Sequence, residues 1–200
     1  MKYLGIIIDS KLSFSRHTSQ IISKITHKLI IFQQIRPFLT IEDSKKFYIS
    51  YVRPLLEYCP VLLCSINKTQ TLQIERLQNK ALRIITYNFD QSMTRIRQQF
   101  RIPTLESRRI VFLLIKTFDI IHGKITTMKF TELKINSPTR NLRSKNKLLL
   151  NIPKFNKVNF GQRSFNYLAP KHWNALPIQI RQIKNRSKFI SSIKEHIYVY

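Results

Sequence analysis

The sequence predicts a mainly α-helical protein that begins with a β-hairpin. Apolar residues recur at helical spacing through most of the first 122 residues, whereas residues 3–8, at the start, form a short, apolar, partly β-branched run that is bounded by Asp9-Ser10. The pattern changes at residues 134–194, which contain no Asp or Glu, several prolines and few periodic runs. We therefore expect a hairpin, a three-helix bundle, a further buried helix and an irregular basic C-terminal segment with short helices.

The hairpin should occupy residues 1–14. We expect a strand over residues 3–8, a turn at Asp9-Ser10 and a second strand over residues 11–14. A lone two-stranded ribbon is marginally stable in water. Since the following chain is helical, this strand has no sheet to join, which indicates that the chain is the C-terminal part of a larger protein.

The helical bundle should occupy residues 15–88. Its first helix is expected from Ser13 or Ser15 to near Arg36, where Pro37 follows, and its second helix over residues 40–60. Pro54 should kink this second helix because proline lacks the backbone N–H, and Pro60 should end it.

The third helix, over about residues 68–87, is the most clearly amphipathic. Its apolar face comprises Ile74, Leu77, Ala81, Ile84 and Ile85. Its opposite face carries Gln73, Arg76, Lys80 and Arg83. Cations on a face with few acidic partners are suited to phosphate groups; the alternative is an ordinary solvated helix surface.

Residues 89–135 should form a second helical region. A short helix is expected over residues 91–100, and a longer one from Pro103-Thr104 to about His122, before Gly123. Residues 110–115 are apolar all round, so we expect this helix to be central and place Phe112, like Leu77, in the core. Arg108 and Arg109 lie in its first turns, where either phosphate binding or packing beside the bundle explains them equally well.

Residues 136–200 form the basic C-terminal segment, which we expect to be draped over the body and to end in a helix from Ser187 to about Tyr198. Aromatic and basic side chains alternate here, as in proteins that stack on unpaired bases. The candidate cations are Arg140, Lys157, Arg163 and Lys171. For Phe165 and Trp173 we prefer the alternative that they anchor the segment onto the helical core.

The charge balance points to a polyanionic partner. There are 35 Lys and Arg against 10 Asp and Glu, for a formal net charge of +25. Nucleic acid is the commonest such partner, and an anionic membrane surface is the weaker rival. We see no signal peptide, and the most apolar run, residues 110–121, is too short to span a bilayer. We therefore expect an intracellular protein, in the nucleus or cytoplasm, with no membrane partner.

The sequence lacks the residue patterns of an enzyme. Adjacent acidic residues occur at Glu42-Asp43, where they are explained by helix capping, and no Asp-Asp pair is present to hold two metal ions. Cys59 and Cys64 have neither a His nor a second Cys pair nearby, so they are expected to be buried thiols rather than zinc ligands. We predict no catalytic residue, no metal site and no cofactor.

Five blocks, in order along the chain, resemble the C-terminal region of reverse transcriptases from jockey-like non-LTR retrotransposons. They are KYLGI with DSKLSF at 2–14, YVRPLLEYC at 51–59, LQNKALRII at 77–85, LESRR at 105–109, and Thr139-Arg140 with SFNYLAPKHWNALP at 164–177. The resemblance implies that 1–14 is the end of a polymerase palm, 15–88 a thumb, 89–135 a post-thumb region and 136–200 the terminal segment. One departure is PVLL at 60–63, where the family usually has an aromatic residue.

The resemblance also implies a function. The first block, with Lys2, Tyr3 and Gly5, would contact the primer end, and the thumb would grip the RNA–DNA template–primer duplex. The catalytic Asp residues and their Mg²⁺ would belong to a polymerase domain upstream that this chain lacks, so the chain is not an enzyme on its own. Two alternatives remain: a stand-alone basic helical nucleic-acid-binding protein, and a helical protein-interaction module.

Overall fold

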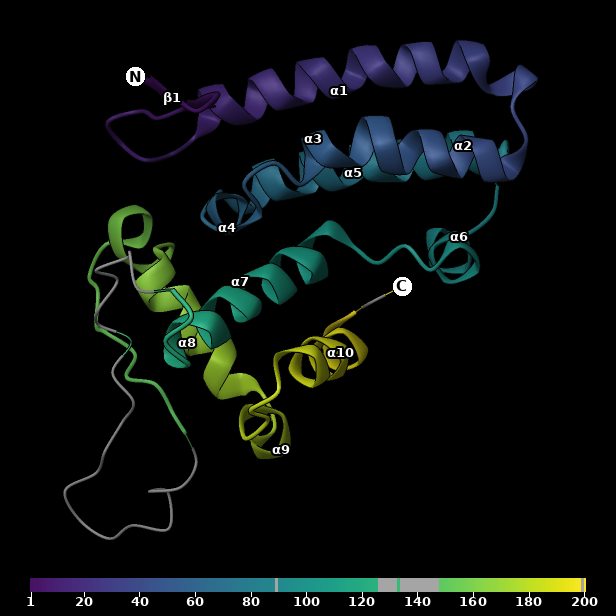
Figure 1. Ribbon diagram of the computed structural model, residues 1–200. Helices are drawn as coiled ribbons and strands as arrows, with labels where there is room; N and C mark the ends of the chain where they lie inside the picture. The colour runs from purple at the N-terminus through teal and green to yellow at the C-terminus, as the bar shows by residue number, and fades with distance from the viewer. Residues whose placement is uncertain (89, 126–132, 134–147, 199) are drawn as a thin grey trace, which may run out of the picture.

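The computed structural model describes residues 1–88, 90–125, 133, 148–198 and 200, and the predicted mainly helical fold with a two-stranded N-terminal hairpin is confirmed (Figure 1). The strands are β1 (Lys2–Tyr3) and β2 (Ile6–Ile7). The helices are α1 (Ser15–Ile35), α2 (Ile41–Phe47), α3 (Arg53–Leu56), α4 (Pro60–Leu63), α5 (Lys68–Thr86), α6 (Met93–Phe100), α7 (Leu105–Ile121), α8 (Phe165–Ala175), α9 (Ile178–Arg181) and α10 (Arg186–Ile197). None of the described helices is long and apolar enough to cross a membrane.

The hairpin is shorter than predicted and turns at a different place. Its turn is Leu4-Gly5, both at positive φ (45° and 80°), and Tyr3 pairs with Ile6 across it. The predicted turn at Asp9-Ser10 is present, since the Leu12 backbone N–H donates a 3.0 Å hydrogen bond to the Asp9 carbonyl, but the predicted strand at 11–14 is wrong. Instead, the Asp9 carboxylate accepts hydrogen bonds from the backbone N–H groups of residues 11, 13 and 14 and so bends the chain into α1. Glycine makes the tighter turn because it adopts positive φ without steric cost.

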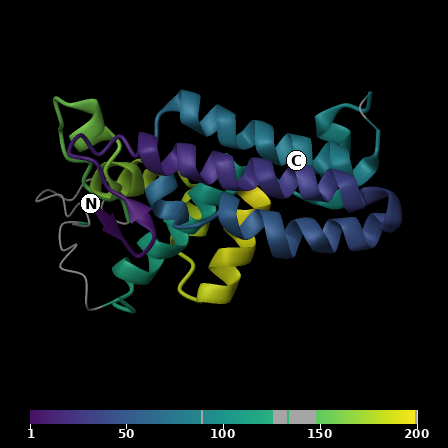
Figure 2. The same ribbon diagram turned by 90° about the horizontal axis from the view of Figure 1, so that it is seen from above.

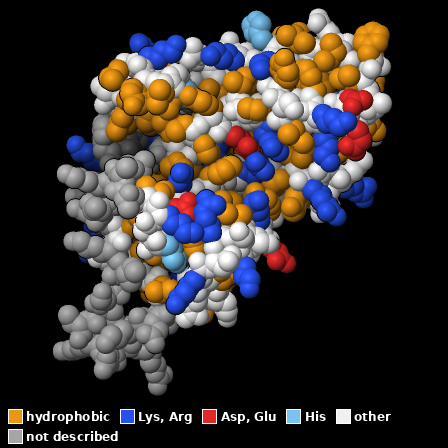
Figure 3. Space-filling view, viewed as in Figure 1, with side chains coloured by type: hydrophobic (Ala, Val, Ile, Leu, Met, Phe, Trp, Pro, Cys, Tyr) orange, Lys and Arg blue, Asp and Glu red, His pale blue; other side chains and the backbone are white. Residues whose placement is uncertain are grey.

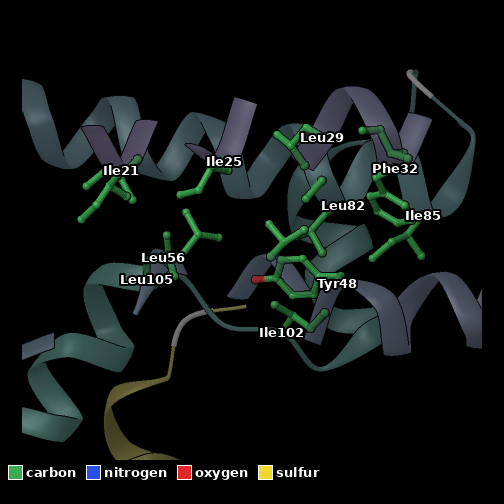
Figure 4. Close-up of a cluster of buried hydrophobic side chains, with 14 of the residues drawn as sticks. Ile21, Ile25, Leu29, Phe32, Tyr48, Leu56, Leu82, Ile85, Ile102 and Leu105 are labelled. Atoms are coloured by element: carbon green, nitrogen blue, oxygen red, sulfur yellow. The ribbon is translucent and has the colours of Figure 1, made fainter. Parts of the chain in front are cut away.

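Helix α1 has the predicted length, and the Ser13 hydroxyl accepts a 3.3 Å hydrogen bond from the backbone N–H of Ser15 at its start, although the N-cap position is Phe14. Phe14, in the left-handed region at φ 54°, precedes the first turn and makes no side-chain capping bond. Apolar residues three or four apart put one stripe of α1 onto α5 and α2–α3. Figure 4 shows this core, in which Ile25, Leu29 and Phe32 of α1 point toward side chains of the other helices.

The predicted second helix is interrupted twice. Between α2 and α3 the chain forms a π-helical turn at Tyr48–Val52. Pro54 follows this turn, and its missing N–H explains the widened hydrogen-bond pattern. The prediction that Pro60 ends this helix is wrong, because α3 stops at Leu56 and Pro60 opens α4. Proline suits the first turn of a helix, where its N–H would have no partner anyway.

Helix α5 starts at a capping box, in which Asn67 and Gln70 exchange side-chain-to-backbone hydrogen bonds. Ile74, Ala81, Ile84 and Ile85 are buried as predicted, whereas Leu77 is only half-buried and Leu82 takes a fully buried place. Leu77 is less buried than predicted because the neighbouring residue, Gln78, occupies the core. Gln78 accepts a hydrogen bond from the Tyr48 hydroxyl and donates one to the Pro103 carbonyl, both 2.9 Å long.

Helix α7 joins this first core to a second one. Its N-terminal residue Leu105 belongs to the first cluster, while Val111, Leu114 and Phe118 pack on α8 and α10. Phe112, predicted to be core, is only half-buried. The short helices predicted in the C-terminal segment are confirmed as α8, α9 and α10, whereas the expectation that residues 148–198 are draped over the body is wrong. Phe118, Phe189 and Trp173 pack with ring centroids 4.4 Å and 5.7 Å apart, so this segment builds a core of its own with α7.

Candidate nucleic-acid interface

The exposed face of α5 carries the predicted row of Arg76, Lys80 and Arg83. All three side chains are exposed and, with Asn79, line a shallow hollow. Figure 2 shows α5 along one long edge of the bundle, with its outer side away from α1. Among the described residues no carboxylate forms an ion pair with any of the three. Ile74 and Ala81 are buried in the core that α5 shares with α1, so this row, on the opposite side of the helix, faces outward.

The single carboxylate of α5, Glu75, faces away from the row. Its Oε1 lies 2.6 Å from Arg97 of α6, and its Oε2 accepts a hydrogen bond from the Leu105 backbone N–H at the start of α7. Burial raises the pKa of the Glu75 carboxyl, and the charge of Arg97 offsets part of that rise. Because Glu75 is used to join three helices, the cationic row has no acidic neighbour on its own helix.

Arg108 is held inside the protein rather than presented to a ligand. Its guanidinium donates two hydrogen bonds to the carboxylate of Glu57, at the end of α3, and its side chain is 15% exposed. Burial lowers the pKa of Arg108, but hydrogen bonding to Glu57 and its charge outweigh burial and raise it. This geometry favours the packing alternative for Arg108 over phosphate binding.

Arg109 points to a different place from its neighbour. It is 3% exposed, and its Nε and Nη2 atoms have no hydrogen-bond partner in the described part of the chain. Burial lowers the pKa of this guanidinium. Arg109 lines a pocket together with side chains of α4, α5, α7 and α8. This pocket was not predicted from the sequence, since its lining comes from segments as far apart as Leu63 and His172.

The predicted residues of the hairpin are all exposed. Lys2 and Tyr3 form β1, and Gly5 lies in the turn. The Tyr58 hydroxyl, from the segment after α3, donates a 2.5 Å hydrogen bond to the Leu4 carbonyl and so ties this turn to the bundle. A Cβ at position 5 would lie 3.5 Å from that hydroxyl, at a φ that favours glycine.

The candidate cations of the C-terminal segment are less uniform. Lys157 and Lys171 are exposed, Arg163 is half-buried, and Arg140 lies outside the described residues. Trp173 is buried and donates a 2.8 Å hydrogen bond to the Leu148 carbonyl, which supports the predicted anchoring role. It is therefore not available for stacking on bases.

Cations are abundant in the part of the chain that the structure describes, whereas clustered metal ligands are absent from it. On the face drawn in Figure 3, Lys and Arg side chains outnumber Asp and Glu. No group of three or more His, Cys, Asp or Glu in the described ranges is placed to hold a metal ion. Cys59 and Cys64 are free half-buried thiols, and burial raises the pKa of Cys64 to about 12. Comparisons with protein-family models, curated proteins and solved structures gave no match to this chain.

Proposed function

We propose that this chain is the thumb and post-thumb part of a non-LTR retrotransposon reverse transcriptase, and that it grips the template–primer duplex without catalysing polymerisation. The observation that carries the proposal is the unpaired row of Arg76, Lys80 and Arg83, which lies within and just before the LQNKALRII block that resembles the thumb. The bundle of α1, α2–α3 and α5 supports it, because a thumb has three helices in this order.

The row of Arg76, Lys80 and Arg83 is long enough to contact the phosphate backbone of a duplex. A helix rises about 1.5 Å per residue, so positions 76 to 83 span roughly 10 Å along one edge of the bundle. A duplex carries one phosphate charge per about 1.7 Å of its axis, so the three cations meet several phosphates over that length. Such contacts position a duplex without reading its sequence, as a polymerase thumb requires.

In the whole polymerase, the hairpin with Lys2, Tyr3 and Gly5 would contact the primer end while α5 holds the duplex. Lys157, Arg163, Lys171 and Arg140 would add contacts from the C-terminal segment. The catalytic carboxylates and Mg²⁺ would come from an upstream polymerase domain. A Tyr-x-Asp-Asp sequence in the genomic region upstream, in frame or one frameshift away, would support this assignment, and unrelated DNA there would argue against it.

One observation favours a second candidate, a stand-alone nucleic-acid-binding protein. Helices α7, α8 and α10 share a hydrophobic core of their own, in which Phe118, Trp173 and Phe189 are buried. Both candidate functions require nucleic-acid binding, so the binding experiment tests both of them. The genomic sequence upstream of this chain distinguishes one candidate from the other.

The binding experiment measures the affinity for an RNA–DNA hybrid of about 20 base pairs by fluorescence anisotropy between about 50 and 200 mM salt. Arg76, Lys80 and Arg83 are replaced together by Gln. We expect the slope of log K against log salt to decrease in magnitude by roughly 2–3, about one for each phosphate that the variant no longer neutralises.

A matched control removes the same charge elsewhere. Lys184, Lys188 and Lys194 are exposed on the C-terminal helices and the segment between them, and their replacement by Gln lowers the net charge equally. If this control changes the slope as much as the α5 variant, the row is only part of a general charge effect. An unchanged slope in the α5 variant would mean that α5 does not face the duplex.

A further inference from the structure

A pocket of about 340 Å³ lies beside Arg109, lined by residues of α4, α5, α7 and α8 together with those between α4 and α5. Its apolar wall includes Leu63, Ile66 and Leu168. Its polar lining includes Lys68, Thr71 and His172. A concave site with an apolar wall and a few convergent polar groups has the composition of a small-molecule site.

Arg109 is the unusual member of this lining. Arg36 is also nearly buried, and its guanidinium donates four hydrogen bonds to the carbonyl oxygens of Leu39, Ile84 and Ile85. Arg109 is more deeply buried, yet its Nε and Nη2 donate none to the described residues. A buried guanidinium without acceptors is costly. A ligand that brings oxygen acceptors would remove that cost.

The other charges near Arg109 leave the pocket open to an anion. Lys68 adds a second cation at the lining, and burial together with Lys171 lowers the pKa of His172. Glu106, in the lining, and Glu75 and Glu57, outside it, act on the charge of Arg109 from a distance, but none of the three forms an ion pair with it. Arg109 therefore keeps its hydrogen-bonding capacity for a ligand.

We propose that this pocket binds a small organic anion, with its carboxylate or phosphate on Arg109 and its apolar body against Leu63, Ile66 and Leu168. A guanidinium fork matches both oxyanions, because it presents parallel N–H donors to two oxygens. Lys68 attracts the anion, and the Thr71 hydroxyl supplies a further donor. A duplex is too wide for a pocket of this size, so this site is separate from the α5 row and independent of the proposed function.

The test uses isothermal titration of the full chain with benzoate, phenyl phosphate and benzyl alcohol. Benzoate and phenyl phosphate distinguish carboxylate from phosphate, and benzyl alcohol carries a similar body without charge. We expect saturable binding of at least one anion and none of the alcohol. Arg109→Met should weaken anion binding at least about tenfold, since a hydrogen-bonded charged pair contributes about 1.5–3 kcal/mol. Lys188→Met, at an exposed position of α10 outside the pocket lining, should leave it unchanged.

Two further lining residues keep the test decisive if Arg109→Met does not fold. Glu106→Gln should strengthen anion binding because it removes a like charge, and Lys68→Gln should weaken it. The proposal is overturned if neither anion binds saturably, if Arg109→Met binds as the wild type does, or if these two variants do not shift the affinity in opposite directions.

Discussion

Glu57, at the end of α3, accepts two hydrogen bonds from Arg108 in the first turns of α7. Removing this carboxylate tests how strongly the contact joins α3 to α7. The second of these bonds, from Arg108 Nη2 to Glu57 Oε2, is 2.9 Å long, and Arg53 lies 3.7 Å from the same carboxylate. The side chains of Glu57 and Arg108 are only 14% and 15% exposed. Glu57→Leu would therefore leave a mostly buried guanidinium without its partner.

The expected loss in the free energy of unfolding is large for a single ion pair. Breaking a buried pair from one side costs about 3–5 kcal/mol, because an uncompensated charge stays inside. Replacing both partners by apolar residues of similar size removes that charge as well, so Glu57→Leu with Arg108→Met should regain at least about 2 kcal/mol of that loss. With an m-value near about 2 kcal/mol/M, the single variant should shift the urea midpoint by about 1.5–2.5 M.

The measurement is urea unfolding followed by circular dichroism and by the fluorescence of Trp173, the one tryptophan of the chain. Trp173 lies in the second core, so coincident transitions would show that the two cores unfold together. If Glu57→Leu costs less than about 1 kcal/mol, a value typical of exposed pairs, Arg108 is not held in this way. It would then again be a candidate for phosphate binding.

Two further predictions concern the core and pH. Phe118→Ala should destabilise the protein by about 3–5 kcal/mol, because it removes a ring from the centre of the second core. Phe112 is only half-buried, so Phe112→Ala should destabilise the protein clearly less. Equal losses of stability in urea unfolding would show that this core is misassigned. The ring nitrogens of His17 are buried and have no hydrogen-bond partner among the described residues. Burial, and to a lesser extent the charge of Lys24, lowers the pKa of His17 below its ordinary value of 6.5. The stability that the neutral ring contributes is therefore complete above pH 6.5 and is lost as the pH falls below that value. His17→Leu should therefore lose less thermal stability than the wild type between about pH 7.5 and 5.5, and an identical pH profile would refute this assignment.

Most helices of residues 15–122 could be predicted because their signals are local, whereas the break after Leu56 and the start of α4 at Pro60 could not. Periodic apolar residues define the buried stripe of α1 and α5, and caps such as Asn67 and Thr104 define where helices begin. The exposed row of Arg76, Lys80 and Arg83 follows from the same periodicity, since the residues opposite a buried stripe face solvent. Periodicity gave the wrong result for Leu77 and Leu82, because the buried Gln78 broke the rule that polar residues lie outside.

The sequence by itself thus determined the helical class, the cationic face of α5 and the excess of positive charge. Only the tertiary structure decided the roles of Arg108 and Arg109. They are adjacent in α7, but successive residues of a helix point about 100° apart, so one meets Glu57 and the other enters a pocket without a partner for its Nε and Nη2 among the described residues. The second core was likewise a tertiary outcome, because its side chains come from α7 and from a distant segment that includes α8 and α10. Contacts between such distant segments leave no periodic signal in the chain, which is why the sequence predicted that Trp173 anchors the segment but not that it packs against Phe189.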